Sequence, residues 1–183
     1  VSFSELMSRL QKEEGKISDE KKLKKIVEDL KKKNKRIVWT NGCFDLLHIG
    51  HTRYLKEAKK LGDCLIVGLN SDESVRKLKG NSRPIQSERE RAEILSSLEF
   101  IDHIIIFPEL SPERYLKELQ PDVYVKGGNY SVEELKNHSE GKAVQSYGGE
   151  VAVIKLIDKI STSKIVEKIK SEENDLAIRN KVC

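Results

Sequence analysis

Residues 40–51 read Thr40-Asn41-Gly42-Cys43-Phe44-Asp45-Leu46-Leu47-His48-Ile49-Gly50-His51. A short apolar strand over 36–40 leads into this stretch, which turns at a glycine and then opens a helix with two histidines three residues apart. At this spacing the two imidazoles share one helix face, beside unpaired backbone N–H groups and the positive end of the helix dipole. Gly42 and Gly50 have no side chain to keep a ligand from the backbone. The stretch therefore predicts a site for a multiply charged phosphate.

The composition is that of a single soluble domain. The chain has 183 residues, of which 35% are charged and 37% hydrophobic, enough for one core and too few for two large domains. Its three cysteines, Cys43, Cys64 and Cys183, form no CxxC pair, which argues against a disulfide framework or zinc knuckle and indicates a reducing cytosol. No apolar run reaches the roughly 18–20 residues of a transmembrane helix, and a signal-peptide core is absent. We therefore expect a cytoplasmic protein with no membrane partner.

Positive charge is concentrated in residues 21–36, which hold nine lysines and arginines against two acidic residues. Such a stripe can bind nucleic acid. No aromatic residue is interleaved for base stacking, so the pattern favours the solvated face of an amphipathic helix. We expect no nucleic-acid partner.

From Arg36 onward, apolar strands alternate with helices. Strands are predicted over 36–40, 64–69, 103–107, 123–125 and 151–156. Helices are predicted over 18–34, 49–61, 70–77 and 87–98, from Ser111-Pro112-Glu113 onward, after the fourth strand to about Tyr147, and from Ser161 to about Lys170; a further helix near Ser4 is expected before Gly15. Ser87 and Glu90 have the spacing of a capping box, and Pro112 is expected at a first helical position.

This alternation predicts an α/β fold, a doubly wound five-stranded parallel sheet of the Rossmann-like kind with an N-terminal helical extension. Ligands of such sheets bind beyond the carboxyl ends of the strands, at the point where strand order reverses. Four polar segments directly follow predicted strands: 41–51, 70–83, 126–130 and 158–163. The fold would bring all four to one edge of the sheet.

Each polar segment has an ordinary reading beside the functional one. His48 and His51 lack the HExxH pattern and a third ligand, so a zinc site is disfavoured, and the glycines spell neither a P-loop nor GxGxxG. Lys79 and Arg91 could be solvated, but their places after the second strand would let them reach phosphates held at the histidine turn. The two glycines that follow Lys126 in the sequence suggest a loop that closes on a ligand. The hydroxyls at 161–163 suit helix capping and also phosphate binding.

With these residues in view, the chain resembles the HxGH-class nucleotidyltransferases of the cytidylyltransferase-like superfamily, over about 36–170. The matching motifs are Gly42-Cys43-Phe44-Asp45 leading into His48-Ile49-Gly50-His51, and Ile160-Ser161-Thr162-Ser163-Lys164-Ile165. Within that class it is most similar to the adenylyltransferases of bacterial heptose activation, through Asn70-Ser71-Asp72 with Ser74-Val75, Leu78-Lys79-Gly80 with Arg83-Pro84, and Pro121-Asp122-Val123 with Val125-Lys126-Gly127-Gly128.

The resemblance implies an enzyme that transfers AMP from ATP to D-glycero-β-D-manno-heptose 1-phosphate, giving ADP-heptose and pyrophosphate for the lipopolysaccharide inner core. It implies Mg²⁺ carried with ATP, no metal ligands on the protein, and a homodimer. Many relatives fuse this domain to a sugar kinase, for which this chain has no room, so we expect a separate heptose kinase upstream. We expect a helical extension at 1–35, a nucleotidyltransferase domain at 36–170 and a C-terminal tail at 171–183.

The resemblance also assigns roles to residues. Catalysis is expected of His48, His51, Lys79 and Arg91, with the histidines donating to the α- and β-phosphates and the two basic residues clamping the triphosphate. Nucleotide binding is expected of Asn41, Gly42, Cys43, Phe44, Gly50, Lys126, Gly127, Asn129, Ser161, Thr162 and Ser163. The chain departs from the family at Asn129, where Asp is usual, and at Ser163, where Thr is usual. The second change keeps the hydroxyl, whereas the first removes a charge.

Two other functions fit parts of this pattern. A cytidylyltransferase acting on glycerol 3-phosphate or a similar alcohol phosphate would share the fold and the phosphate site. A non-catalytic nucleotide- or nucleic-acid-binding protein would use the basic residues at 21–36, and would show salt-dependent binding without turnover.

Overall fold

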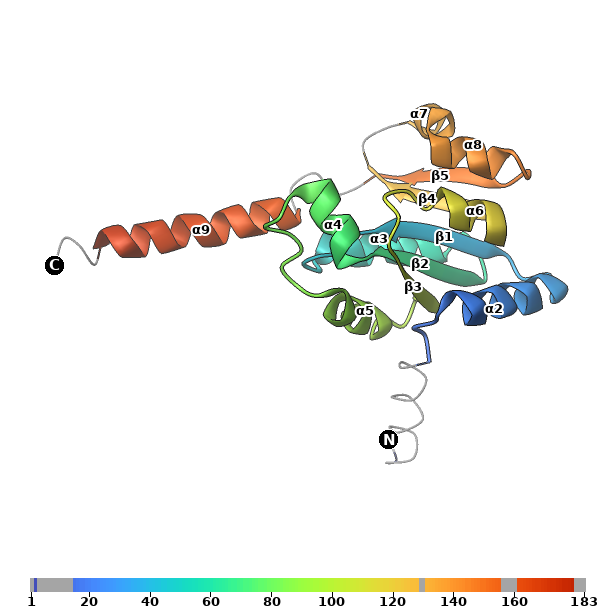
Figure 1. Cartoon of the computed structure of the whole chain (residues 1–183), viewed down its shortest axis with the longest axis horizontal. Helices are drawn as coiled ribbons and strands as arrows, with labels where there is room; N and C mark the ends of the chain where they lie inside the picture. Colours follow the sequence, from blue (N-terminus) through green and yellow to red (C-terminus); the bar gives the residue numbers. More distant parts are fainter. Residues whose placement is uncertain (1, 3–14, 129–130, 156–160, 180–183) are drawn as a thin grey trace.

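The computed structural model describes residue 2 and residues 15–128, 131–155 and 161–179, with side chains in the last helix as far as residue 171. This part contains eight helices and one five-stranded sheet, and all the helices except α9 lie around the sheet (Figure 1). The strands are β1 (Ile37–Gly42), β2 (Cys64–Asn70), β3 (His103–Phe107), β4 (Val123–Gly127) and β5 (Glu150–Ile154). The helices are α2 (Glu20–Lys32), α3 (Ile49–Lys59), α4 (Asp72–Lys79), α5 (Glu88–Ser96), α6 (Glu113–Leu119), α7 (Val132–Asn137), α8 (Ser139–Gln145) and α9 (Thr162–Arg179).

All five strands are parallel and run in the order β3-β2-β1-β4-β5. The chain builds outward from β1 through β2 to β3, then returns to the other side of β1 for β4 and β5. Strand order therefore reverses between β1 and β4, and a ligand is expected beyond the carboxyl ends of these two strands. This confirms the predicted α/β class and the doubly wound arrangement.

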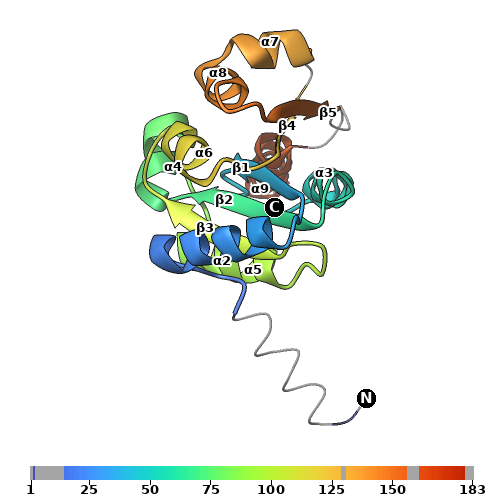
Figure 2. The same ribbon diagram turned by 90° about the vertical axis from the view of Figure 1, so that its right-hand side faces the viewer.

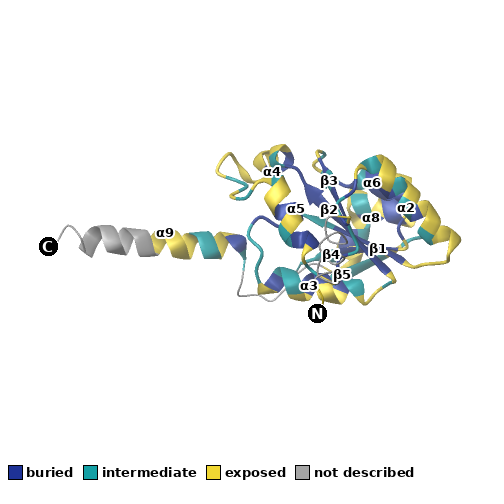
Figure 3. Ribbon diagram, turned by 90° about the horizontal axis from the view of Figure 1, so that it is seen from below, coloured by how far each residue is buried: buried dark blue, intermediate teal, exposed yellow. Residues whose placement is uncertain are grey.

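Helices cover both faces of the sheet (Figure 2). One face packs its apolar side chains under α2, α6, α7 and α8, with Trp39 fully buried and stacked on Tyr115 at a ring-centroid distance of 5.9 Å. The other face packs under α3 and α5. Figure 3 shows the strands buried between these layers and the helix surfaces exposed. The strands read as nearly continuous apolar runs because both of their faces are covered.

Most predicted elements are present, with shifted ends. Leu23 and Val27 of α2 are buried as expected of its apolar face, and the Ser87–Glu90 capping box is formed at α5. Pro112 precedes α6 as its cap rather than its first residue, a shift within the usual uncertainty of helix ends. The helix expected near Ser4 lies outside the described residues.

Two helical predictions were incomplete. The piece expected to run to Tyr147 is divided into α7 and α8, because His138 has extended backbone angles between them. The two short helices lie very close, since a Cβ at Gly141 would stand 2.1 Å from the carbonyl oxygen of Leu135. The last helix continues to Arg179, past the end expected at Lys170. In Figure 1, α9 leads away from the sheet at its carboxyl edge.

Candidate nucleotide site

The turn after β1 is shaped by Gly42 and Phe44. Phe44 has a positive φ of 43°, and its buried ring folds back over Gly42. A Cβ at position 42 would meet that ring at 3.1 Å, so the close packing favours glycine there. The backbone of Gly42, Cys43 and Phe44 is thereby held along one wall of a cavity.

Asp45 anchors this turn to the loop after α4. Its carboxylate is 1% exposed and accepts from Arg83 Nη1 at 2.8 Å and from the backbone N–H groups of Ile85 at 2.7 Å and Gln86 at 3.2 Å. Burial alone would raise the pKa of Asp45, but these three donors outweigh it and lower that pKa. The guanidinium of Arg83 is therefore committed to Asp45.

The two histidines lie stacked at the start of α3. Their ring centroids are 3.8 Å apart, and His48 caps the helix by accepting from Gly50 N at its Nδ1 atom, at 3.1 Å. Because Nδ1 is the acceptor, the neutral ring carries its proton on Nε2, which can donate to a ligand. Burial, reinforced by the charges of His48 and Lys79 and opposed by a hydrogen bond to the backbone of Leu46, lowers the pKa of His51 to about 4. Burial also lowers the pKa of His48. Both rings are therefore neutral at pH 7.

Arg91 occupies a different place from the one expected. Its side chain is 1% exposed and does not line the cavity. It donates from Nη1 to the carbonyls of Cys43 at 2.6 Å and Asn70 at 2.9 Å, from Nη2 to Asp72 at 2.7 Å, and from Nε to the carbonyl of Gln86 at 3.1 Å. With these bonds Arg91 holds the cavity wall from behind, and its direct contact with phosphate is not supported.

The ends of β1 and β4 form the floor of the cavity. Lys126 Nζ donates to the hydroxyl of Tyr124 at 3.3 Å, and that hydroxyl donates to Asn41 Oδ1 at 3.2 Å. Burial lowers the pKa of Lys126, while Glu140 and Cys43 oppose this effect. Tyr54 of α3 reaches the same strands, because its hydroxyl donates to the carbonyl of Val125 at 3.0 Å and is hydrogen-bonded to Thr40.

The start of α9 closes the cavity from another side. Thr162 is buried, and its hydroxyl donates to the carbonyl of Leu46 at 3.3 Å. Ser161 Oγ accepts from the backbone N–H of Lys164 at 3.3 Å, as an N-cap does. The positive end of the α9 dipole thus lies beside the histidine turn.

These segments enclose a cavity of about 150 Å³ at the point where strand order reverses. Its lining comprises Asn41, Gly42, Cys43, Phe44, Asp45, His51, Tyr54, Lys79, Lys126, Gly127 and Thr162. Of the residues predicted from sequence, His48, Gly50, Arg91, Ser161 and Ser163 do not line it, and Asn129 lies outside the described residues. Two lining residues were missed as site residues: Asp45, although it stands in the quoted motif, and Tyr54, whose helical spacing indicated only a core position.

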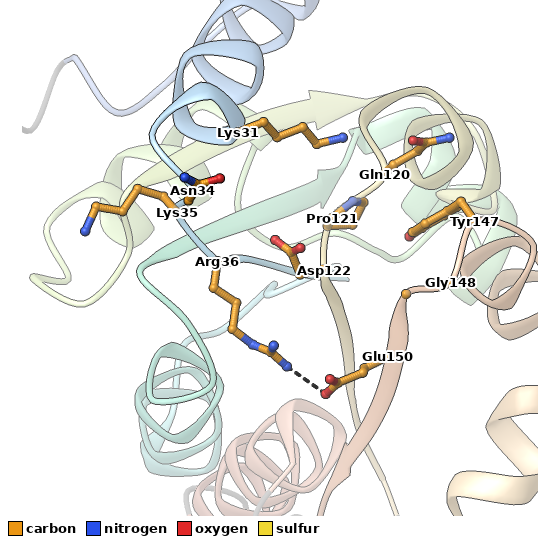
Figure 4. Close-up of a pocket in the computed structure, with 11 residues that line it drawn as sticks. Lys31, Asn34, Lys35, Arg36, Gln120, Pro121, Asp122, Tyr147, Gly148 and Glu150 are labelled. Carbon is orange, nitrogen blue, oxygen red and sulfur yellow. Dashed lines mark hydrogen bonds and ion pairs between the residues drawn. The ribbon is translucent and has the colours of Figure 1, made fainter.

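A larger hollow of about 520 Å³ lies at the opposite edge of the sheet (Figure 4). Arg36 and Glu150 cross it as an ion pair of 2.7 Å, and Lys31 extends toward it from α2. It adjoins the amino ends of β1 and β5, where doubly wound sheets do not usually bind ligands. The smaller cavity, which is lined by His51 and by backbone from several strand ends, is therefore the better candidate site.

Metal-binding groups are sparse in the part of the chain that the structure describes. No three His, Cys, Asp or Glu side chains gather there in a way that could hold a metal ion. Asp45, the carboxylate in the cavity lining, is already paired with Arg83. Among the same described residues, no helix is long and apolar enough to cross a membrane.

Comparison with known proteins agrees with this geometry. The cytidylyltransferase-like family model matches residues 39–168. The bifunctional protein HldE of Syntrophotalea carbinolica is 47% identical over 156 residues, which cover 85% of this chain and 31% of that protein. The HldE of Geotalea uraniireducens is 48% identical over 158 residues, covering 86% of this chain and 32% of the relative. The chain thus spans about a third of the length of these curated relatives.

A solved structure shows the same fold. The lipopolysaccharide core biosynthesis protein from Thermoplasma volcanium is 31% identical, with a TM-score of 0.54, over 67% of this chain and 97% of that one. The family match over residues 39–168 includes the histidine turn, the strand ends and the start of α9. The chain belongs to the cytidylyltransferase-like family.

Proposed function

We propose that this protein is a sugar-phosphate adenylyltransferase, which transfers AMP from ATP to D-glycero-β-D-manno-heptose 1-phosphate and releases pyrophosphate. The observation that carries the reaction type is the cavity between β1 and β4, where His51, Lys79, Lys126 and the start of α9 meet around a glycine turn. The choice of heptose rests on the HldE relatives and on the lipopolysaccharide core biosynthesis protein of similar fold.

In this reaction a phosphate oxygen of the sugar attacks the α-phosphorus of ATP in line. One P–O bond forms, the bond between the α-phosphorus and the bridging oxygen breaks, and pyrophosphate leaves with Mg²⁺ that arrived bound to ATP. The attacking oxygen is already anionic at neutral pH, so a strong general base is unnecessary. Catalysis is then mainly positioning and neutralisation of charge.

The residues take complementary roles in this proposal. His48 and His51 donate as neutral imidazoles to phosphate oxygens that gain negative charge. Lys79 neutralises the triphosphate, helped by the hydroxyls and backbone N–H groups at the start of α9. Asp45 in the cavity lining and Arg91 behind the wall keep the turn and the loop after α4 in place.

The test is pyrophosphate release by the purified protein, with ATP or CTP as donor and heptose 1-phosphate or glycerol 3-phosphate as acceptor. We expect turnover with ATP and heptose 1-phosphate. His48→Ala and His51→Ala are each expected to lower kcat about 100-fold, the usual effect of removing a transition-state donor. His138→Ala, at the exposed junction of α7 and α8, is the matched control and should retain full activity.

Two results would overturn the proposal. Histidine variants with unchanged rates would exclude the mechanism, and turnover only with CTP and glycerol 3-phosphate would replace the substrates. A homodimer and a cytoplasmic location remain predictions, which sedimentation and cell fractionation can test. The proposal also requires a kinase activity that forms heptose 1-phosphate, on whichever chain that activity resides.

A further inference from the structure

The floor of the cavity contains a directed hydrogen-bond relay over two neighbouring strands. It runs from Lys126 through Tyr124 to Asn41, at 3.3 Å and 3.2 Å. An ammonium group can only donate, so the Tyr124 hydroxyl must accept from Lys126 and give its own proton to Asn41. The amide oxygen of Asn41 therefore faces Tyr124, which leaves the Nδ2 group of Asn41 to meet a ligand.

Of the three residues in the relay, one is buried and the other two can contact a ligand. Tyr124 is 0% exposed and belongs to the hydrophobic core, whereas Asn41 and Lys126 line the cavity. No carboxylate in the described part of the chain forms an ion pair with Lys126. The floor thus presents N–H donors and one positive charge, the chemistry that recognises an anionic oxygen cluster.

Nucleotidyl transfer to a sugar phosphate brings two anions into one cavity, and they repel each other. Two separate cationic positions are available for them. Lys79, at the end of α4, lies close enough to His51 for its charge to help lower the pKa of that ring, which suits the triphosphate. Lys126 and Asn41 lie on the strand ends and remain for the second anion.

We propose that Tyr124 is a positioning residue that holds Asn41 and Lys126 as a donor pair for the phosphate group of the sugar phosphate acceptor. This inference rests on the proposed function for the identity of the reaction, but not for the anion chemistry of the floor.

Tyr124→Phe tests the relay because it removes one hydroxyl and keeps the buried ring. We expect the KM for the sugar phosphate to rise about tenfold, the usual weight of a hydrogen bond to a charged group, while the KM for ATP stays within about twofold. Tyr147→Phe is the matched control. Tyr147 also packs against this core, but its buried hydroxyl has no hydrogen-bond partner among the described residues, so both KM values should remain unchanged.

A second variant separates positioning from a general structural effect. Lys126→Met should raise the acceptor KM by itself, and in that background Tyr124→Phe should add less than about twofold, since residues that act in one network are not additive. Should Tyr124→Phe fail to fold, Lys126→Met carries the same expectation for the two KM values. A rise confined to the ATP KM, full additivity of the two substitutions, or no change in either KM would each overturn the inference.

Direct binding distinguishes failure of this inference from failure of the proposed function. Calorimetric titration with heptose 1-phosphate, glucose 1-phosphate and glycerol 3-phosphate requires no turnover. If the wild-type protein binds a phosphate monoester but releases no pyrophosphate, the proposed function is wrong, and about tenfold weaker binding by Tyr124→Phe still supports the relay. Equal binding by both proteins, or no monoester binding by the wild type, would refute the relay whatever the activity.

Discussion

Arg91→Met tests whether Arg91 stabilises the site or contacts the substrate directly. Arg91 is buried and donates to three backbone carbonyls and to the carboxylate of Asp72. Methionine keeps much of the side-chain volume but leaves these acceptors without their donor. Breaking a buried ion pair costs about 3–5 kcal/mol, and the lower end applies here because the Asp72 side chain is 25% exposed. For a domain of this size, that loss lowers Tm by about 10 °C.

The assay is thermal unfolding by circular dichroism together with pyrophosphate release below the transition. Arg89→Met is the matched control, because Arg89 is exposed on the same helix and should change stability by less than about 0.5 kcal/mol. If Arg91→Met melted with the control yet lost its turnover, Arg91 would act on the substrate itself, and the supporting role inferred from its hydrogen bonds would be wrong.

Three other substitutions test the site. The folded-state pKa of His51, about 4, lies below the ordinary 6.5, so the unfolded chain binds the proton more tightly. Denaturant titrations should therefore show the free energy of unfolding falling by on the order of 3 kcal/mol as the pH drops from 6.5 to 4. His51→Asn should remove most of this pH dependence. Asp45→Asn leaves Arg83 without its buried partner and should cost about 3 kcal/mol, measured by urea unfolding; no loss would contradict the anchoring role. Lys79→Met should lower kcat/KM for ATP about 100-fold without changing Tm, whereas the neighbouring Lys77→Met should leave both unchanged in the same assays.

The elements were predictable because their signals are local. Apolar runs marked the strands, and the serine and glutamate at 87 and 90 marked the start of α5. Once a parallel sheet was inferred, the segments after the strands had to meet at one edge. That reasoning placed Lys79, Lys126 and Thr162 beside the turn that contains His51, as the cavity lining has them.

The rest depends on contacts that no local pattern encodes. Arg91 reads as a surface residue of a charged helix, and its burial becomes evident only when carbonyls from positions 43 and 70 come together around it. The pairing of Asp45 with Arg83 spans 38 positions. No proline or glycine occupies position 138, so the sequence did not predict the break between α7 and α8. The residues after Lys170 are polar, so their sequence did not predict that α9 continues.

The reversal of strand order between β1 and β4 also governs when the site can form during folding. β1 first meets β2, its neighbour in sequence, whereas its other edge must wait for β4; Ile37 N, for example, bonds Asp122 Oδ2 across 85 positions. Contacts that close long loops form slowly, because chain entropy is lost before they are made. Trp39, buried in β1, should thus report collapse early in refolding, while the capacity to bind a nucleotide returns only when β4 docks. Recovery of activity during refolding therefore measures when β4 docks against β1.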